Sequence, residues 1–230
     1  MTSPLYKVVL PDSDGVLQSC HGGSGSWDVG VTRSIPASTP LARCEVGLHL
    51  CRAEHLTRWS KEDAVVLRVH VPEGTEMIVE GNKVIVREAT PTGIVGNLNA
   101  RTLGLFAADC TERALLWRIA RGHVHGSDAA AWDAVRVIRA FARGEATEEE
   151  RWFAVVSGGG NASVAASAAA YDVASFIVGI NHARNMVAHE RAWQGRRLIA
   201  YLEAQSTGEE LPPVTLDKRE ERVHNPALHP

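Results

Sequence analysis

The sequence predicts an α+β fold, in which an N-terminal, mainly β α+β domain is followed by a C-terminal helical bundle. In the first hundred residues, short apolar runs are separated by turn-forming residues, whereas later apolar residues recur at three- and four-residue steps. The spacing of apolar residues changes near Pro91-Thr92-Gly93, a turn-like stretch. We therefore expect a β-rich domain at 1–96, a helical bundle at 97–205 and a flexible or extended tail at 206–230.

The expected strands of the first domain are rich in β-branched residues, and each is bounded by Gly, Pro, Asp or Asn. A short helix, AEHLTRWS, follows the run GLHLC, and EGNK has the composition of a hairpin turn between two strands. The expected strands are Leu5–Leu10, GLHLC at 47–51, Ala64–Val71, Met77–Glu80 and Asn82–Ala89.

The second half has helical start and stop signals. Cys110 lies on an apolar stripe between Leu103 and Trp117, which predicts a buried, unreactive thiol. Thr147 and Glu150 have the spacing of a capping box. The other expected helices begin at Ser127-Asp128 and end at Gly144, cover the Ala-rich run Asn161–Ile180, and extend from about Asn181 to Ala204.

Composition argues against several classes of partner. The formal net charge is −3, so there is no basic excess that would indicate nucleic-acid binding. The most apolar window, Asn161–Ile180, is mostly Ala and Ser and contains Asp172, which predicts a buried helix and no membrane partner. The N-terminus lacks signal-peptide features, so we expect a cytoplasmic protein with reduced cysteines.

Four potential metal ligands, Cys44, His49, Cys51 and His55, lie within twelve positions. Their spacing lacks the close pair of ligands that is typical of structural zinc sites, so we predict no metal. His49 and Cys51 share one face of the expected strand, but side chains at this spacing lie about 7 Å apart, too far for a Cys/His nucleophile pair. His21-Gly22-Gly23-Ser24 matches no phosphate-binding motif and is expected to be a loop.

Several stretches of the first half resemble an uncharacterised domain of phage and bacterial proteins that carries a GLHxC signature. They are Tyr6-Lys7, His21-Gly22-Gly23, Trp27, Cys44, Gly47–Cys51, Trp59 and Asn82–Val86. The resemblance covers about the first hundred residues and implies no activity.

The second half resembles helical immunity proteins of bacterial polymorphic toxin systems. The residues that carry this resemblance are Phe106–Cys110, Glu112-Arg113, Ala134-Val135, Ala140–Glu145, Glu190-Arg191, Trp193-Gln194 and Leu198. It implies a protein that binds and neutralises a toxin. The connection WRIARGHVHGSD differs from the acidic, Pro-rich connection of those proteins.

The order of elements in the first half also resembles that of ADP-ribosyltransferases. That resemblance implies NAD as cofactor and a pocket lined by His21, His49 and Glu80. Lys83 stands where the resemblance requires a catalytic acid, and a cation there would disfavour a cationic transition state.

We therefore expect a non-enzymatic, macromolecule-binding protein without a cofactor, in a phage–host or toxin-immunity setting, whose partner is a host protein or a toxin. The binding energy is expected at exposed aromatic residues, and the candidates are Trp27, Trp59 and Trp117 because each has polar neighbours in the sequence. The alternative is an NAD-using transferase with His21, His49 and Glu80 at its catalytic site.

Overall fold

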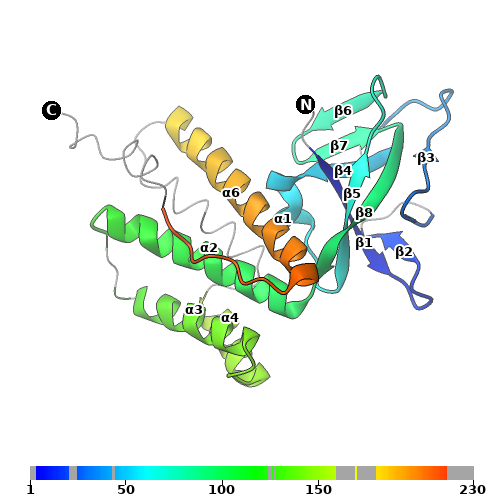
Figure 1. Ribbon diagram of the computed structural model, residues 1–230. Helices are drawn as coiled ribbons and strands as arrows, with labels where there is room; N and C mark the ends of the chain where they lie inside the picture. The colour runs from blue at the N-terminus through cyan, green and yellow to red at the C-terminus, as the bar shows by residue number, and fades with distance from the viewer. Residues whose placement is uncertain are drawn as a thin grey trace. The chain divides into compact units, whose positions relative to one another are not determined.

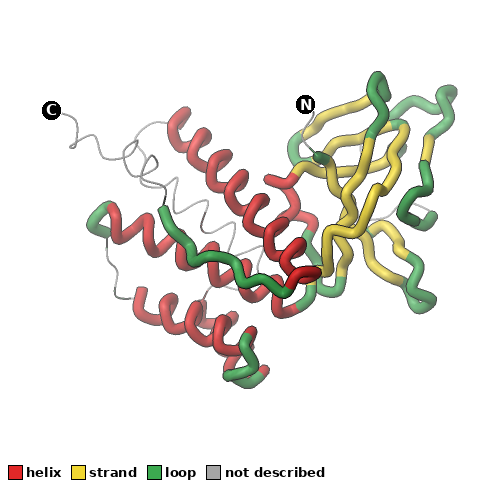
Figure 2. The backbone as a smooth tube through the Cα atoms, in the orientation of Figure 1, coloured by secondary structure: helices red, strands yellow, loops and turns green. Residues whose placement is uncertain are grey.

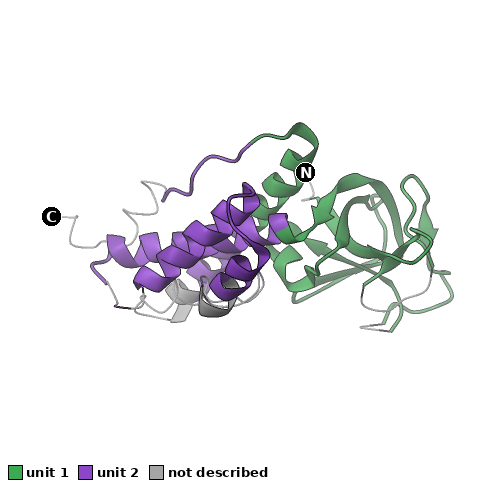
Figure 3. Ribbon diagram, turned by 90° about the horizontal axis from the view of Figure 1, so that it is seen from below, with its two compact units in different colours: residues 1–100, 195–209 green, residues 101–194, 210–230 purple. Residues whose placement is uncertain are grey.

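The computed structural model describes residues 4–20, 25–42, 45–123, 126, 128–158, 169 and 180–216. It is an α+β structure, in agreement with the predicted class (Figure 2). The chain forms two compact units (Figure 3). The first unit contains residues 1–100 and 195–209, and the second contains residues 101–194 and 210–230.

The first unit contains one sheet in which the strand pairs of the described residues are antiparallel. The strand order is β3-β8-β5-β1-β4-β7-β6, and β2 pairs with β1 (Figure 1). The strands are β1 Leu5–Pro11, β2 Leu17–Ser19, β3 Arg33–Ser34, β4 Leu48–Arg52, β5 Ala64–His70, β6 Met77–Glu80, β7 Lys83–Val86 and β8 Glu88–Leu98.

One face of the sheet carries a continuous apolar core. Side chains alternate between the faces of a strand, so Leu5, Lys7 and Val9 of β1 lie on the same face. Leu5 and Val9 pack in a cluster with Trp27 and with apolar residues of β4, β5, β7 and β8. This cluster explains why the loop before β3 is held on the sheet, since it delivers Trp27 to the core.

The predicted hairpin turn at EGNK is confirmed. Glu80 and Lys83 are paired across β6 and β7, and Gly81 between them has a φ of +55°. This left-handed conformation is the one that two-residue hairpin turns require and that glycine adopts without strain.

Pro91-Thr92-Gly93, turn-like in composition, does not interrupt the sheet, because β8 runs through it. Arg68 of β5 lies opposite Gly93 and Val69 lies opposite Pro91, which leaves Thr92 as an extra residue, and a second shift falls at Val95. These are β-bulges, where a strand tolerates a proline and bends without ending.

Helical segments pack closely on the first unit. The 3-10 helix η1 (Ala53–His55) and α1 (Leu56–Trp59) follow β4, as predicted. In the C-terminal part of α6 (Ile180–Thr207), a Cβ on Gly195 would lie 2.5 Å from the carbonyl carbon of Ala53. A Cβ on Gly96 would lie 2.6 Å from the carbonyl oxygen of Leu202. The two glycines therefore allow backbones to approach where any side chain would collide.

The second unit contains α2 (Ala100–Ala120, from residue 101), α3 (Asp128–Ala142), α4 (Glu148–Gly158) and the first part of α6. The capping box is confirmed, because the Glu150 backbone N–H donates to Thr147 Oγ1 and the Thr147 backbone N–H donates to Glu150 Oε2. The stop at Gly144 is confirmed by its φ of +77°. The Ala-rich run 161–180 lies outside the described residues except Ala169 and Ile180.

A buried ion pair lies in the second unit. Arg113 Nε donates to Glu190 Oε2 at 2.8 Å, and both side chains are 1% exposed. Gln194 Nε2 donates to the other oxygen of Glu190. Cys110, on the same helix as Arg113, is fully buried, as predicted.

The first two residues of the expected tail belong to α6, and the described residues after Gly208 form no helix or strand and pack on the protein at their end. Val214 is buried, and Leu216 packs against Trp117 and Met186. The carbonyl of Thr215 accepts a hydrogen bond from Arg113. Residues from 217 onward lie outside the described part of the chain. No helix among the described residues has the length and apolarity needed to cross a bilayer.

Candidate functional site

Two of the three tryptophans expected to be exposed are buried, so that expectation is wrong for them. Trp27 is 3% exposed and Trp117 is 2% exposed. Trp27 is a member of the core of the sheet, and its backbone N–H donates to the carbonyl of Leu17. Trp117 packs with Met186. Polar neighbours in the sequence did not indicate exposure, because the backbone directs these two side chains inward.

Trp59 is half-buried. Its indole N–H donates to the carbonyl of Asn82, and the Lys83 ammonium lies 5.3 Å from its ring centroid. Its role in binding a partner stays a prediction.

The most exposed aromatic side chains of the described residues are Trp152 and Phe153 on α4, at 57% and 55%. Their ring centroids lie 5.3 Å apart in an edge-to-face arrangement. Ala154, the next residue, is buried with Ala134, Val135 and Ile138 of α3. Because α4 packs on α3 through this small side chain, its two large aromatic residues are directed to solvent.

Acidic residues precede this aromatic pair. Glu145, Glu148, Glu149 and Glu150 are all exposed. Hydrogen bonds from Arg143 to Glu145, from Arg151 to Glu148 and from the Thr147 backbone to Glu150 lower the pKa of each of these carboxyl groups. Glu145, Glu148 and Glu150 are therefore ionised at neutral pH. We define Glu148, Glu149, Glu150, Trp152 and Phe153 as the α4 surface.

A buried lysine lies in the first unit on the core face of the sheet. Lys7 is 8% exposed, and its ammonium donates to Ser19 Oγ at 2.8 Å and to the carbonyl of His49 at 3.2 Å. Among the described residues no carboxylate forms an ion pair with it. Burial lowers the pKa of Lys7 to about 8.

Lys7 and a second cation, Arg33, lie beside the indole ring of Trp27. The Lys7 ammonium is 4.8 Å from the centroid of a Trp27 ring, and the Arg33 guanidinium is 5.1 Å from it. Arg33 also donates to the carbonyl of Ser26. The ring attracts both cations, while the two cations repel each other. This arrangement places two positive charges beside the core of the sheet.

His49 and Cys51 share a face of β4, as predicted, but have no features of a nucleophile pair. Cys51 is buried and donates to the carbonyl of Tyr6 at 3.7 Å. Burial raises the pKa of its thiol to about 12. Burial also lowers the pKa of His49, whose Nε2 has no hydrogen-bond partner among the described residues. A neutral thiol is a poor nucleophile.

The remaining predicted site residues are divided between described and undescribed segments. His21 and Cys44 lie outside the described residues. Glu80 is the last residue of β6, opposite Lys83. In the described part of the chain no group of three His, Cys, Asp or Glu side chains could hold a metal ion.

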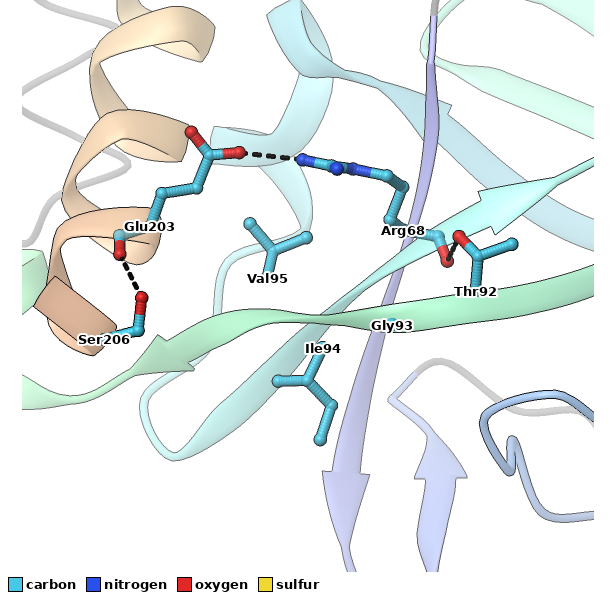
Figure 4. A pocket seen from close by; sticks show the side chains of 7 residues that line it. All are labelled: Arg68, Thr92, Gly93, Ile94, Val95, Glu203 and Ser206. Carbon is cyan, nitrogen blue, oxygen red and sulfur yellow. Dashed lines mark hydrogen bonds and ion pairs between the residues drawn. The ribbon is translucent and has the colours of Figure 1, made fainter.

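A shallow hollow of about 270 Å³ lies beside the bulges of β8 (Figure 4). Arg68 and Glu203 form an ion pair of 2.7 Å at its rim, and both side chains are about half exposed. Val95 and Ile94 point to opposite sides of the strand (Figure 4). Its polar lining side chains are Arg68, Thr92, Glu203 and Ser206, and none of them is buried. The side chains that line this hollow therefore do not indicate a catalytic reaction.

Trp152 and Phe153 were not among the side chains that the sequence predicted to be exposed. The available signal was the adjacent pair Trp152-Phe153, because two consecutive residues of a helix cannot both lie on the centre of one face. Comparison of the chain with family models, with curated proteins and with solved structures finds no match.

Proposed function

We propose that this chain is a non-enzymatic protein that binds another protein through the α4 surface. The observation that carries the proposal is the solvent exposure of two adjacent large aromatic side chains, Trp152 and Phe153. Aromatic residues dominate the binding energy of many protein interfaces because they bury a large area at a small entropic cost.

The charge of the surface specifies the partner. Glu148 is paired with Arg151, but Glu149 and Glu150 also lie next to the aromatic pair, so the partner that fits has an apolar pocket bordered by Lys or Arg. A second copy of this chain fits poorly, because it would bring two acidic α4 surfaces together. The partner is thus a basic protein.

The biological setting is proposed from the resemblance of the second half to immunity proteins, with the partner a toxin or a phage or host protein. We also propose that the helices of the second unit form a bundle that holds α4. The packing of α4 on α3 supports this arrangement.

Affinity capture from a lysate of the native host tests the proposal. The wild-type chain is compared with the double variant Trp152→Ala, Phe153→Ala. The control is Ile119→Ala, which removes another exposed apolar side chain of the second unit. We expect the double variant to retain at least about tenfold less of a specific basic protein. An unchanged set of captured proteins would refute the proposal.

A second candidate function is binding of an anionic ligand by the first unit, with NAD as the ligand of the transferase alternative. The observation that favours it is the pair of cations, Lys7 and Arg33, beside Trp27. Lys7 and Trp27 are buried, so the half-buried Arg33 is the cation of this group that a phosphate of the ligand would contact.

The test of this second function is incubation of the purified chain with NAD, alone and with host lysate. Nicotinamide release and adducts are followed by mass spectrometry. Release that disappears in Glu80→Gln or His21→Ala would establish the transferase and remove the non-enzymatic proposal. If no nicotinamide is released in either incubation, the NAD-using alternative is rejected.

A further inference from the structure

The strand β6 ends the sheet and has exposed apolar side chains. Among the described residues it pairs with β7 alone, and Figure 1 shows it beyond β7 at the edge of the sheet. Met77, Ile78 and Val79 are 43%, 36% and 53% exposed. Three consecutive exposed apolar residues place apolar surface on both faces of the strand.

This edge has little of the protection that sheet edges usually carry. The opposite edge, β3, is only two residues long, and such short strands offer little to pair with. Between Glu76 and Glu80, β6 has no Pro, Lys or Arg. An open, apolar edge strand is a template on which an incoming strand forms main-chain hydrogen bonds.

The ladder with β7 indicates which backbone groups are open. The Arg87 N–H donates to the carbonyl of Glu76, so Glu76 and Arg87 form a hydrogen-bonded pair. In an antiparallel ladder such pairs alternate with pairs whose N–H and C=O groups point away from each other. Met77 and Val79 are in the second kind of pair, and their backbone N–H and C=O groups point to the free edge.

We propose that the free edge of β6 binds an extended segment of a partner protein in which an apolar centre is flanked by basic residues. The acidic residues at both ends of the strand select this chemistry. Within the sheet, Glu80 already lies opposite Lys83, and Arg87 donates to Glu76 through Nε at 2.8 Å. β7 and the residue after it, Arg87, therefore already have the sequence pattern that pairs with β6. Two basic residues, Lys83 and Arg87, are separated by Val-Ile-Val.

Pairing of β6 with a second copy of itself is disfavoured. An antiparallel pair centred on Ile78 would bring Glu76 of each copy opposite Glu80 of the other. Like charges directly opposite each other destabilise a strand pair. The charge pattern therefore favours a basic partner segment over a symmetric dimer.

The test uses a labelled peptide with the sequence of residues 82–88, NKVIVRE, and fluorescence anisotropy with the full chain. The control peptide is NEVIVEE, in which Glu replaces Lys83 and Arg87. We expect saturable binding of the first peptide and at least roughly tenfold weaker binding of the control, with a smaller difference at high salt. Equal binding of the two peptides, or no saturable binding, would overturn the proposal.

Two variants of Val79 separate the contribution of its main-chain N–H to peptide binding from the contribution of its side chain. Val79→Pro removes an outward N–H without removing a hydrogen bond to β7, whereas Val79→Ala keeps this N–H. We expect Val79→Pro to weaken peptide binding by about tenfold or more and Val79→Ala to weaken it by less than about threefold. Circular dichroism of both variants verifies the fold, and equal affinities of the two would contradict main-chain pairing.

Amide hydrogen exchange provides a measurement that does not need a variant. Exchange at Met77 and Val79 should slow when the peptide is bound, with no change at Ile119. Unchanged exchange at both positions would overturn the proposal. The double variant Trp152→Ala, Phe153→Ala should bind the peptide like the wild type, so this proposal and the one for the α4 surface fail independently. A wild-type dimer that Val79→Pro abolishes would identify a second copy as the occupant and overturn the basic-segment proposal.

Discussion

Lys7 is an ammonium group held in an apolar core by two neutral oxygen acceptors and an indole ring. Transfer of a charge into such a site is costly unless a counter-charge accompanies it, and the usual response is a shift of the pKa. The lowered pKa of Lys7, about 8, has this cause, because burial is the largest contribution to it. Protonation of a single residue therefore couples the stability of the sheet to pH.

The free energy of unfolding should rise between pH 8 and pH 10 through Lys7. In this range the unfolded chain, with a lysine pKa of 10.5, holds more protons than the folded chain, with a pKa of about 8. Stability rises with pH wherever the unfolded state binds more protons, here by at most about 1.4 kcal/mol per pH unit. Urea unfolding of wild type and Lys7→Met at pH 7, 8, 9 and 10 measures this effect.

The comparison with Lys7→Met removes contributions of other titrating groups, such as Tyr6, whose pKa burial raises. We expect the difference in unfolding free energy, wild type minus variant, to increase over this range. A difference that stays constant would show that Lys7 is protonated to the same extent in both states.

At the level of elements, local sequence signals predicted what depends on neighbouring residues. The Gly81 turn, the Thr147–Glu150 capping box and the end of α3 at Gly144 each depend on a few consecutive residues. The passage of β8 through Pro91 depends on β5, which is more than twenty residues earlier in the sequence. Local composition therefore marks this stretch as turn-like, whereas pairing with a neighbouring strand makes it a bulge.

Gly195→Ala should destabilise the first unit, because the added Cβ would lie 2.5 Å from backbone atoms of Ala53. Backbone atoms cannot yield as the end of a flexible side chain can, so the helix must shift. We expect a loss of about 1–3 kcal/mol of unfolding free energy, although Ala is the better helix former.

Gly93→Ala is the matched control, because nothing lies within 4 Å of its added Cβ. It should change the unfolding free energy by less than about 0.5 kcal/mol. Chemical denaturation of both variants measures the difference. A Gly195→Ala protein that is as stable as the wild type would show that α6 does not approach Ala53 of η1 this closely.

At the scale of the whole chain, the first unit is built from two separate stretches of sequence. Leu198 and Leu202 of the second stretch are fully buried, and Gln205 exchanges two hydrogen bonds with the backbone of Asn97. The predicted domain 1–96 lacks all four of these residues. The α+β class could be predicted from the change in the spacing of apolar residues. The return of the second stretch to the first unit could not be predicted, because the apolar pattern of a helix does not specify which surface the helix covers.

Contacts between residues distant in the sequence also decided which candidate site residues are exposed. The helical period placed Cys110 correctly in the interior, since a stripe of apolar residues surrounds it. Trp27 lies in a loop, where no period indicates a direction, and its burial results from contacts with distant strands. Exposure of Trp152 depends on the packing of α4 on α3, which the sequence of α4 alone does not specify.

A fragment of residues 1–100 should therefore fail to hold the native fold. Without 195–209 it loses the fully buried Leu198 and Leu202, and each such leucine is worth about 2–5 kcal/mol, comparable to the whole stability of a small domain. Circular dichroism and thermal unfolding of the fragment measure this loss. A fragment that melts cooperatively at the temperature of the full chain would contradict the two-stretch unit.

The division of the first unit between residues 1–100 and 195–209 also has a consequence during synthesis. A ribosome adds about 5–20 residues per second, so the sheet emerges several seconds or more before the helix that completes it. Until then the close contact at Gly96 is missing, while the edge strand β6 has already been synthesised. Nascent chains of this protein thus pass through a period in which a chaperone, or the binding partner itself, has access to an unfinished sheet.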